Sequence, residues 1–268
     1  MFFVMKKIDL IKVEHDTKIG DVCPYKEPNI TEDCIFYENG VSVGFYIKKM
    51  PDRLCKIADL CNSEFKSKNV PKTLMQRPKM LGIDENGKGI IDRSVSQMSS
   101  ILGGVPPKPH MRRDYPTISS VHSVKSAQTF IKAMLLLAKE SEKFVKEILP
   151  EQYEKQLKIF ENVNSKYKFG NLFTSSISNY NISAPFHRDT ANIENCINVI
   201  ITKKKLCKGG DLHVPDYDLT MNSADNSMLV YPAWKNVHGV TPIIPFTEDS
   251  YRNSLIFYPL KAFLNLID

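Results

Sequence analysis

The most informative stretch of this sequence is Pro185-Phe186-His187-Arg188-Asp189, because it indicates both the fold and the position of a functional site. On an extended strand, the spacing of His187 and Asp189 places both side chains on the same side of a sheet. A second histidine, His238, follows after enough chain to leave one strand, cross a small sheet and return beside it. The stretch therefore predicts two neighbouring strands that bring three polar side chains together.

Those three side chains form a recognisable set of metal ligands. Two imidazoles and one carboxylate hold non-haem Fe(II) on one side and leave coordination positions open for chemistry. A single His or Asp is more often structural, but the complete set in this order is rare and predicts an iron site. His187, Asp189 and His238 are therefore the predicted metal ligands and catalytic residues.

A basic residue after the second histidine supplies a further part of such a site. Arg252 and Ser254 are again spaced for one face of a strand. A guanidinium beside a hydroxyl is suited to holding a carboxylate through charge-assisted hydrogen bonds. The pair predicts a clamp for an acidic co-substrate.

The second half of the chain predicts the fold class. Residues 123–149 carry apolar side chains at helical spacing, and Pro150 begins a second helix. After Asn164 come short strand-like runs separated by Gly, Pro and Asn, a pattern typical of a sandwich or barrel. We expect an α+β fold with a double-stranded β-helix (jelly-roll) core buttressed by N-terminal helices.

The first half predicts a hairpin, a helix and a long basic segment. Asn39-Gly40 between two β-rich runs is a strong hairpin signal, and Pro51-Asp52 opens a helical pattern. Residues 69–122 predict an irregular region that is either a solvated surface or contacts substrate, with Arg112 and Arg113 as candidate contacts. We expect residues 1–122 to pack on a core formed by residues 123–268.

Composition sets outer limits on the class of protein. The net charge of +6 mildly favours an anionic partner, and no apolar run is long enough for a membrane helix. The six cysteines are scattered without a C-x-x-C pair, which indicates reduced thiols and argues against a zinc site. We expect an intracellular protein, in cytoplasm or nucleus, and the Lys-, Asn- and Ile-rich composition is compatible with a viral protein acting in a host cell.

Residues 169–259, about a third of the chain, resemble the catalytic core of the Fe(II)- and 2-oxoglutarate-dependent dioxygenases. The family pattern is H-x-D, a later His, and then Arg, often as R-x-S. The positions that match it are His187, Asp189, His238, Arg252 and Ser254. Tyr180 is placed similarly to a tyrosine that family members often carry on the strand before the first histidine.

The resemblance implies a cofactor, a co-substrate and a reaction. Fe(II) would be held by the triad, and 2-oxoglutarate by Arg252, Ser254 and Tyr180, with dioxygen as the oxidant. The implied reaction is hydroxylation of an unactivated C–H bond. The carboxylate of Asp189 favours hydroxylation over halogenation, because a Gly or Ala there would open a halide site.

Two branches of this family are similar to the turn regions 208–215 and 238–242. One is the prolyl-hydroxylase-like group; the other contains the ten-eleven-translocation methylcytosine oxidases and the thymine-oxidising J-binding proteins. Asn192 and Asn198 favour the second branch, because an amide can read the edge of a base, although both could instead cap turns or satisfy sheet backbone.

The resemblance therefore implies hydroxylation of the 5-methyl group of thymine or 5-methylcytosine in DNA. Such an enzyme must flip the base and bind phosphates, which the basic residues 69–122 could support. A protein (prolyl-type) or small-molecule hydroxylase with the same iron chemistry remains the alternative. A catalytically silent binding module is disfavoured, because a binder need not keep the full triad and clamp.

Overall fold

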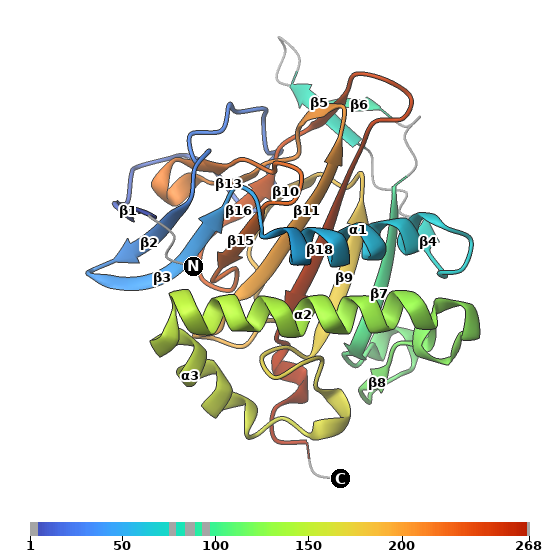
Figure 1. The fold of residues 1–268 in the computed structure, drawn as a ribbon. Coiled ribbons are helices and arrows are strands. Elements are labelled where there is room, and N and C mark those ends of the chain that lie inside the picture. The colour runs from blue at the N-terminus through green and yellow to red at the C-terminus, as the bar shows by residue number, and fades with distance from the viewer. Residues whose placement is uncertain (1–4, 75–78, 84–88, 93–96, 267–268) are drawn as a thin grey trace.

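A computed structural model describes residues 5–74, 79–83, 89–92 and 97–266. Its largest element is a ten-stranded sheet with the order β1-β2-β3-β15-β11-β18-β9-β7-β4, and β8 pairs with β7 (Figure 1). In chain order these strands are β1 (Lys6–Asp9), β2 (Cys34–Glu38), β3 (Val41–Ile47), β4 (Thr73–Leu74), β7 (Met98–Val105), β8 (Thr117–Ile118), β9 (Ser175–Tyr180), β11 (Asn198–Lys205), β15 (Met228–Tyr231) and β18 (Tyr251–Tyr258).

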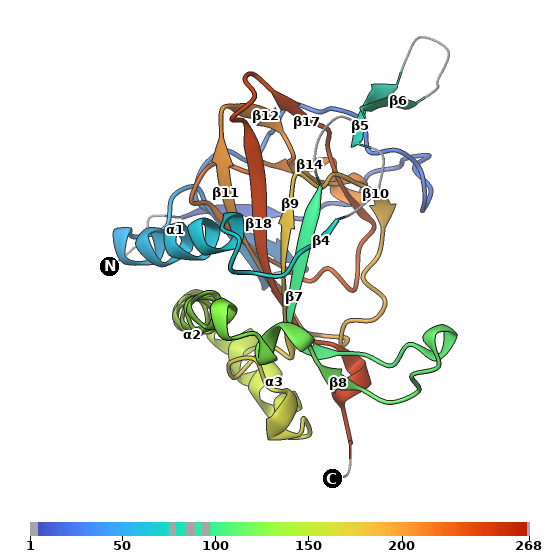
Figure 2. The same ribbon diagram turned by 90° about the vertical axis from the view of Figure 1, so that its right-hand side faces the viewer.

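A second sheet has the order β10-β16-β13-β14, and three helices complete the layers. The bounds are β10 (Ala184–His187), β13 (Leu212–Val214), β14 (Leu219–Met221), β16 (His238–Val240), α1 (Asp52–Lys66), α2 (Gln128–Ile148) and α3 (Pro150–Phe160). Figure 2 shows the helices on one side of the large sheet and the smaller sheet on the other. Two further ribbons are β5–β6 (Lys79–Ile83, Gly89–Asp92) and β12–β17 (Cys207–Gly209, Ile243–Pro245). The predicted α+β fold with a helix-buttressed double-stranded β-helix is confirmed.

The strand alternation of β11 and β18 divides apolar from functional side chains. Val199 and Ile201 of β11, with Leu255 and Phe257 of β18, belong to the main apolar core. That core includes buried residues of α1 and α2, so these side chains lie under the helices. The residues between them face the smaller sheet, which is where a site can form.

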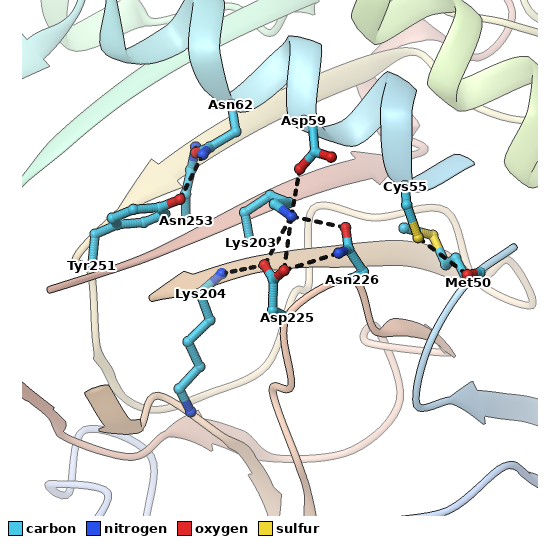
Figure 3. Close-up of polar contacts among 10 residues, drawn as sticks. All are labelled: Met50, Cys55, Asp59, Asn62, Lys203, Lys204, Asp225, Asn226, Tyr251 and Asn253. Carbon is cyan, nitrogen blue, oxygen red and sulfur yellow. Dashed lines mark hydrogen bonds and ion pairs between the residues drawn. The ribbon is translucent and has the colours of Figure 1, made fainter. Parts of the chain in front are cut away.

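A polar cluster fastens α1 to this sheet (Figure 3). The Nζ atom of Lys203 lies 2.7 Å from Asp59 of α1 and 2.9 Å from Asp225, and it donates to Asn226. Burial alone would lower the pKa of Lys203, but the two carboxylates outweigh it and raise the pKa. Each donor of this ammonium group therefore has an acceptor, as a buried charge requires.

The hairpin at β2–β3 is confirmed. Asn39 and Gly40 have φ values of 50° and 79°, and a two-residue turn with both φ values positive matches the twist of its strands. The hairpin extends the large sheet, because β3 pairs with β15. The predicted helices at 52, within 123–149, and at 150 are also present.

The prediction of an irregular segment over residues 69–122 is wrong for β7. This eight-residue strand lies inside the large sheet and pairs with β9 along Met98–Gly103. Its serines and glycines have low strand propensity, which hid it in the sequence. Gly103 is required there, because it has a φ of +76° and a Cβ would lie 2.5 Å from the carbonyl oxygen of Thr174.

Two further findings concern the whole described chain. None of its helices combines the length and apolar character needed to cross a membrane. All six cysteines are buried, and none forms a disulfide within the described residues.

Candidate active site

The two histidines face each other across neighbouring strands. His187 is the last residue of β10 and His238 the first of β16, and the two form a direct register pair. Their ring centroids are 4.4 Å apart. Asp189 lies just after β10, not on it as predicted, and its backbone N–H donates to the carbonyl oxygen of Ala233 over 3.2 Å.

Together the three side chains offer a site for one metal ion. One ligand atom from each of His187, Asp189 and His238 can be chosen so that all lie within 4.8 Å of one another. The Nε2 atom of His187 is 3.6 Å from the Oδ1 atom of Asp189. The predicted residues are thus brought together in space.

Backbone carbonyl groups orient both imidazole rings in the same way. The Nδ1 atom of His187 lies 2.8 Å from the carbonyl oxygen of Pro185, and that of His238 lies 3.0 Å from the carbonyl oxygen of Asn236. A carbonyl oxygen can only accept, so each Nδ1 must carry the proton, which leaves the Nε2 lone pairs free for a metal. Burial and the neighbouring His187 also lower the pKa of His238, which favours the neutral ligand form.

Asn192 and Asn198 support the carboxylate of Asp189. The Nδ2 atom of Asn198 lies 3.3 Å from Oδ2 of Asp189, and that of Asn192 lies 3.4 Å from the same oxygen and 3.0 Å from Oδ1 of Asn198. Both asparagines are nearly fully buried. Their amide donors hold a candidate metal ligand in place, leaving Oδ1 of Asp189 toward His187. Both also line the cavity, and contact of these asparagines with a base stays a prediction.

These residues line one cavity of about 280 Å³ between the two sheets. The metal-ligand candidates and Arg252 with Ser254 belong to the same cavity wall. The remaining wall is largely apolar and includes Ile177, Ile182, Ile200, Leu212, Val240 and Ile256. An apolar cavity with a few convergent polar groups is the usual form of a small-molecule site.

Arg252 is a buried cation whose hydrogen-bonding capacity is not met. Only 3% of the residue is exposed, its Nη1 atom donates to the Oγ atom of Ser254 over 3.1 Å, and its Nε atom has no partner in the described residues. Burial lowers its pKa to about 10. A guanidinium with unused donors in a cavity wall fits a carboxylate ligand. Arg252 and Ser254 thus share one face of β18 as predicted, and their role in holding a carboxylate stays a prediction.

Lys204 adds a second cation that the sequence did not single out. It lies directly opposite Arg252 in the β11–β18 register, and its Nζ atom is 3.9 Å from Asp211. Its nearer acceptor is the carbonyl oxygen of Gly209, at 2.7 Å. The half-buried Lys204 and the buried Arg252 both act electrostatically on the buried carboxylate of Asp211, so positive charge exceeds negative charge beside this end of the cavity.

Tyr180 does not reach the cavity, so the prediction that it holds the co-substrate is wrong. Its ring stacks on Phe65 of α1 with centroids 6.1 Å apart and on Tyr251 at 5.6 Å. It therefore lies on the helix side of the sheet. Strand alternation puts its neighbour Asn179 in the cavity wall instead, directly opposite Ser254. The alternation of β9 was the signal that could have identified Asn179.

Arg112 and Arg113 differ in what they can do. Both lie in the segment between β7 and β8, which projects from the body of the molecule (Figure 2). Arg112 is exposed, whereas the guanidinium of Arg113 donates to the carbonyl oxygen of Pro106 and to Thr117. Arg113 thus holds this segment together, and only Arg112 is free to meet a phosphate.

A family model identifies the family of this chain, and solved structures show its fold. A family model, Tet_JBP, described as the oxygenase domain of the 2OGFeDO superfamily, matches residues 108–261, more than half of the chain. The solved structure of NgTET1 in complex with 5mC DNA is similar with a TM-score of 0.58 and 11% identity, covering 91% of this chain and 83% of that chain. A search of curated proteins found no match.

A second solved structure is a more distant likeness. A 2OG-Fe(II) oxygenase family protein from Burkholderia pseudomallei has a TM-score of 0.46 and 13% identity, covering 80% of this chain and 84% of that chain. At these identities the solved structures concern the fold alone.

Proposed function

Since the chain belongs to the Tet_JBP family of oxygenase domains in the 2OGFeDO superfamily, we propose that it hydroxylates the 5-methyl group of thymine or 5-methylcytosine in DNA. The enzyme class is that of a dioxygenase using Fe(II), 2-oxoglutarate and dioxygen, as predicted. The identity of the substrate is the part that we propose.

We assign the metal to His187, Asp189 and His238. The donor set fits Fe(II): two imidazoles whose Nδ1 atoms are engaged by carbonyl groups, and one carboxylate, offer ligand atoms that lie within 4.8 Å of one another. When bound, iron with 2-oxoglutarate and dioxygen supplies the oxidation of a C–H bond, coupled to decarboxylation of 2-oxoglutarate to succinate. The protein's part is to orient these ligands through Pro185, Asn236 and the asparagines that support Asp189.

We assign the far carboxylate of 2-oxoglutarate to Arg252 and Ser254. The observation that carries this step is the buried guanidinium with an unpartnered Nε atom in the same cavity as the triad. Lys204 adds positive charge from the neighbouring strand. Asn179, opposite Ser254, makes no side-chain hydrogen bond within the described residues, so its amide is available to the co-substrate or to the substrate.

Three features support DNA as the substrate. The family match spans residues 108–261, the similar NgTET1 structure was solved with 5mC DNA, and the net charge is +6. The exposed Arg112 lies in a projecting segment that could contact phosphates. A methyl group inside a duplex would have to be flipped into the cavity, because the triad lies between two sheets.

The test is product analysis. Single- and double-stranded DNA containing thymine or 5-methylcytosine is incubated with the protein, Fe(II), ascorbate and 2-oxoglutarate, then digested to nucleosides for mass spectrometry. We expect a 5-hydroxymethyl pyrimidine formed together with succinate. Hydroxylation of a peptide or metabolite, with no oxidised pyrimidine on either form of DNA, would move the assignment to a protein or small-molecule hydroxylase.

A further inference from the structure

A second, larger hollow lies outside the iron cavity. It has a volume of about 800 Å³ and is bounded by α3 on one side and the β2–β3 hairpin on the other. Figure 1 shows α3 beneath the end of this hairpin. Residues 195–197 and the residues Pro232, Trp234 and Lys235 complete its lining, so four segments that are distant in the sequence meet there. We call this hollow the lysine groove.

The lining of the lysine groove holds three lysines and one carboxylate. Lys155 and Lys158 line it from α3, where their spacing puts them on the same face, and both are exposed. Neither forms an ion pair with any residue in the described ranges. The third lysine, Lys235, is paired with the one carboxylate of the lining, Glu38. The groove is therefore suited to an anion.

The floor offers a surface for a flat apolar group. Trp234 lines the groove, and its indole Nε1 atom is buried without a hydrogen-bond partner in the part of the chain that the structure describes. Ile159 and Pro232 lie in the same lining, with the amides of Asn39 and Asn162 at its edges. Indole and amide groups beside lysines are the combination that binds bases and phosphates of a single nucleic-acid strand.

The lysine groove and the iron cavity lie on opposite sides of two shared segments of chain. Ala233 lines the cavity while its neighbours Pro232 and Trp234 line the groove. The carbonyl oxygen of Ala233 accepts the backbone N–H of Asp189, a proposed iron ligand. On the other segment, Cys196 and Ile197 face the groove, and Asn198 faces the cavity. A strand in the groove would thus lie one residue away from both supports of the iron site.

We propose that the lysine groove binds a segment of DNA strand next to the target nucleotide, with phosphates on Lys155 and Lys158 and a base against Trp234. This inference rests on the proposed DNA substrate and specifies the surface along which the DNA strand would lie. An acidic peptide would match the lysines but would leave the indole without a stacking partner, which is why we favour a nucleic acid.

Trp234 is the single tryptophan of the chain and lines the groove, so tryptophan fluorescence comes from this site. The iron-free full-length protein is titrated with a single-stranded DNA oligonucleotide of about twelve nucleotides, a length that spans one such binding site. We expect saturable quenching. The K155Q/K158Q variant should bind roughly tenfold more weakly, and the slope of log affinity against log salt should fall by about 1.4.

The matched control is K125Q/K132Q, which removes two exposed lysines from the segment that contains α2. It should leave the affinity and the salt slope unchanged, because neither residue lines the groove. Equal weakening by both double variants would overturn the proposal, since it would indicate diffuse attraction. Quenching by polyglutamate with the same affinity as DNA would overturn it in favour of an acidic peptide.

The outcomes separate this proposal from the proposed function. Oxidised pyrimidine without any quenching of Trp234 would retain the function and overturn the groove as the strand's path. Quenching that depends on Lys155 and Lys158, with no oxidised base, would retain the groove as a DNA site and overturn the assigned reaction.

Discussion

The cations on the two faces of the large sheet differ in how completely their charge is paired. On the helix face, Lys203 has two carboxylates, Asp59 and Asp225, within 3 Å of its Nζ atom (Figure 3). On the cavity face, the Nζ atom of Lys204 is 3.9 Å from its one carboxylate, Asp211, and Arg252 retains an unpartnered Nε donor within the described residues. Lys203 and Lys204 are consecutive residues of β11, so one strand carries a fully paired lysine on one face and a poorly paired lysine on the other.

The difference distinguishes a structural charge from a ligand-binding one. A buried ion that is fully paired stabilises the fold relative to the same ion left alone, because its lost hydration is replaced. A buried ion without enough partners costs stability until a ligand of opposite charge arrives. We therefore expect changes on the helix face to alter folding and changes on the cavity face to alter binding.

The largest effect should come from the metal ligands on the cavity side. His187→Ala or His238→Ala should abolish iron retention and the conversion of 2-oxoglutarate to succinate, because two ligands rarely suffice to hold Fe(II). Anaerobic iron titration measures the first and succinate assays the second. His15→Gln, a histidine paired with Asp216 outside the cavity, is the control. Undiminished iron binding in both alanine variants would remove the proposed ligand set.

Arg252→Ala should weaken 2-oxoglutarate binding while iron affinity stays nearly unchanged. Loss of a charge-assisted contact of this kind costs about 2–4 kcal/mol, which is well over tenfold in apparent affinity. The measurement is the 2-oxoglutarate dependence of succinate formation beside an iron titration. A variant that lost iron and kept its 2-oxoglutarate response would show that Arg252 serves the metal instead.

Lys203→Met should show the reverse behaviour. Removing the cation leaves Asp59 and Asp225 to repel each other, and we expect a loss of about 1–3 kcal/mol in the free energy of unfolding. Its affinity for 2-oxoglutarate should be that of the unmodified protein. Denaturant unfolding of this variant and of Arg252→Ala tests the comparison directly. Equal destabilisation by both would mean that the two faces do not differ.

Gly210→Ala should disturb the clamp without removing it. Gly210 has a φ of +71°, and a Cβ there would lie 3.1 Å from Cδ of Arg252. We expect the apparent affinity for 2-oxoglutarate to fall, by less than in Arg252→Ala. Gly20→Ala is the matched control, because Gly20 has a φ of +96° and no atom within 4 Å of its would-be Cβ. A similar loss of affinity in both would trace the effect to backbone strain.

The smallest effect should appear at alkaline pH, with opposite signs for the two lysines. The raised pKa of Lys203 means that its stabilisation is complete below the unfolded pKa and is lost as pH rises through the folded value. Burial lowers the pKa of Lys204, so its cost is present below the folded pKa and is relieved as pH rises toward the unfolded value.

The measurement is the free energy of unfolding for the unmodified protein, Lys203→Met and Lys204→Met at pH about 9 and about 11, which bracket the ordinary lysine value. The free energy of unfolding of the unmodified protein minus that of Lys203→Met should decrease as pH rises. The corresponding difference between the unmodified protein and Lys204→Met should increase. The same trend in both would contradict the assigned environments.

Strand alternation explains which site residues could be predicted from the sequence. The spacing of Arg252 and Ser254 gave a shared face correctly because both lie on one regular strand. Tyr180 was misassigned because its strand has two faces and the sequence alone does not say which one meets the cavity. The role of Asn192 was missed because its partners are set by a turn, and turn geometry is not readable from composition.

Long-range packing explains the rest. The fold class followed from helices before strands, but β7 was hidden by serines and glycines whose strand conformation depends on β9 beside them. The lysine groove combines the hairpin, α3 and two turns, so no local pattern could indicate it.

The pairing of β10 with β16 has a consequence for how the enzyme keeps its metal. These two strands share only two register pairs, Ala184 with Val240 and His187 with His238, with an irregularity between them. An ion bound by both histidines would cross-link β10 and β16 at the end of this short pairing. Iron occupancy would then determine how often β10 separates from β16 at the edge of the smaller sheet. Loss of iron would increase amide hydrogen exchange in these two strands first, and only later in the rest of the molecule.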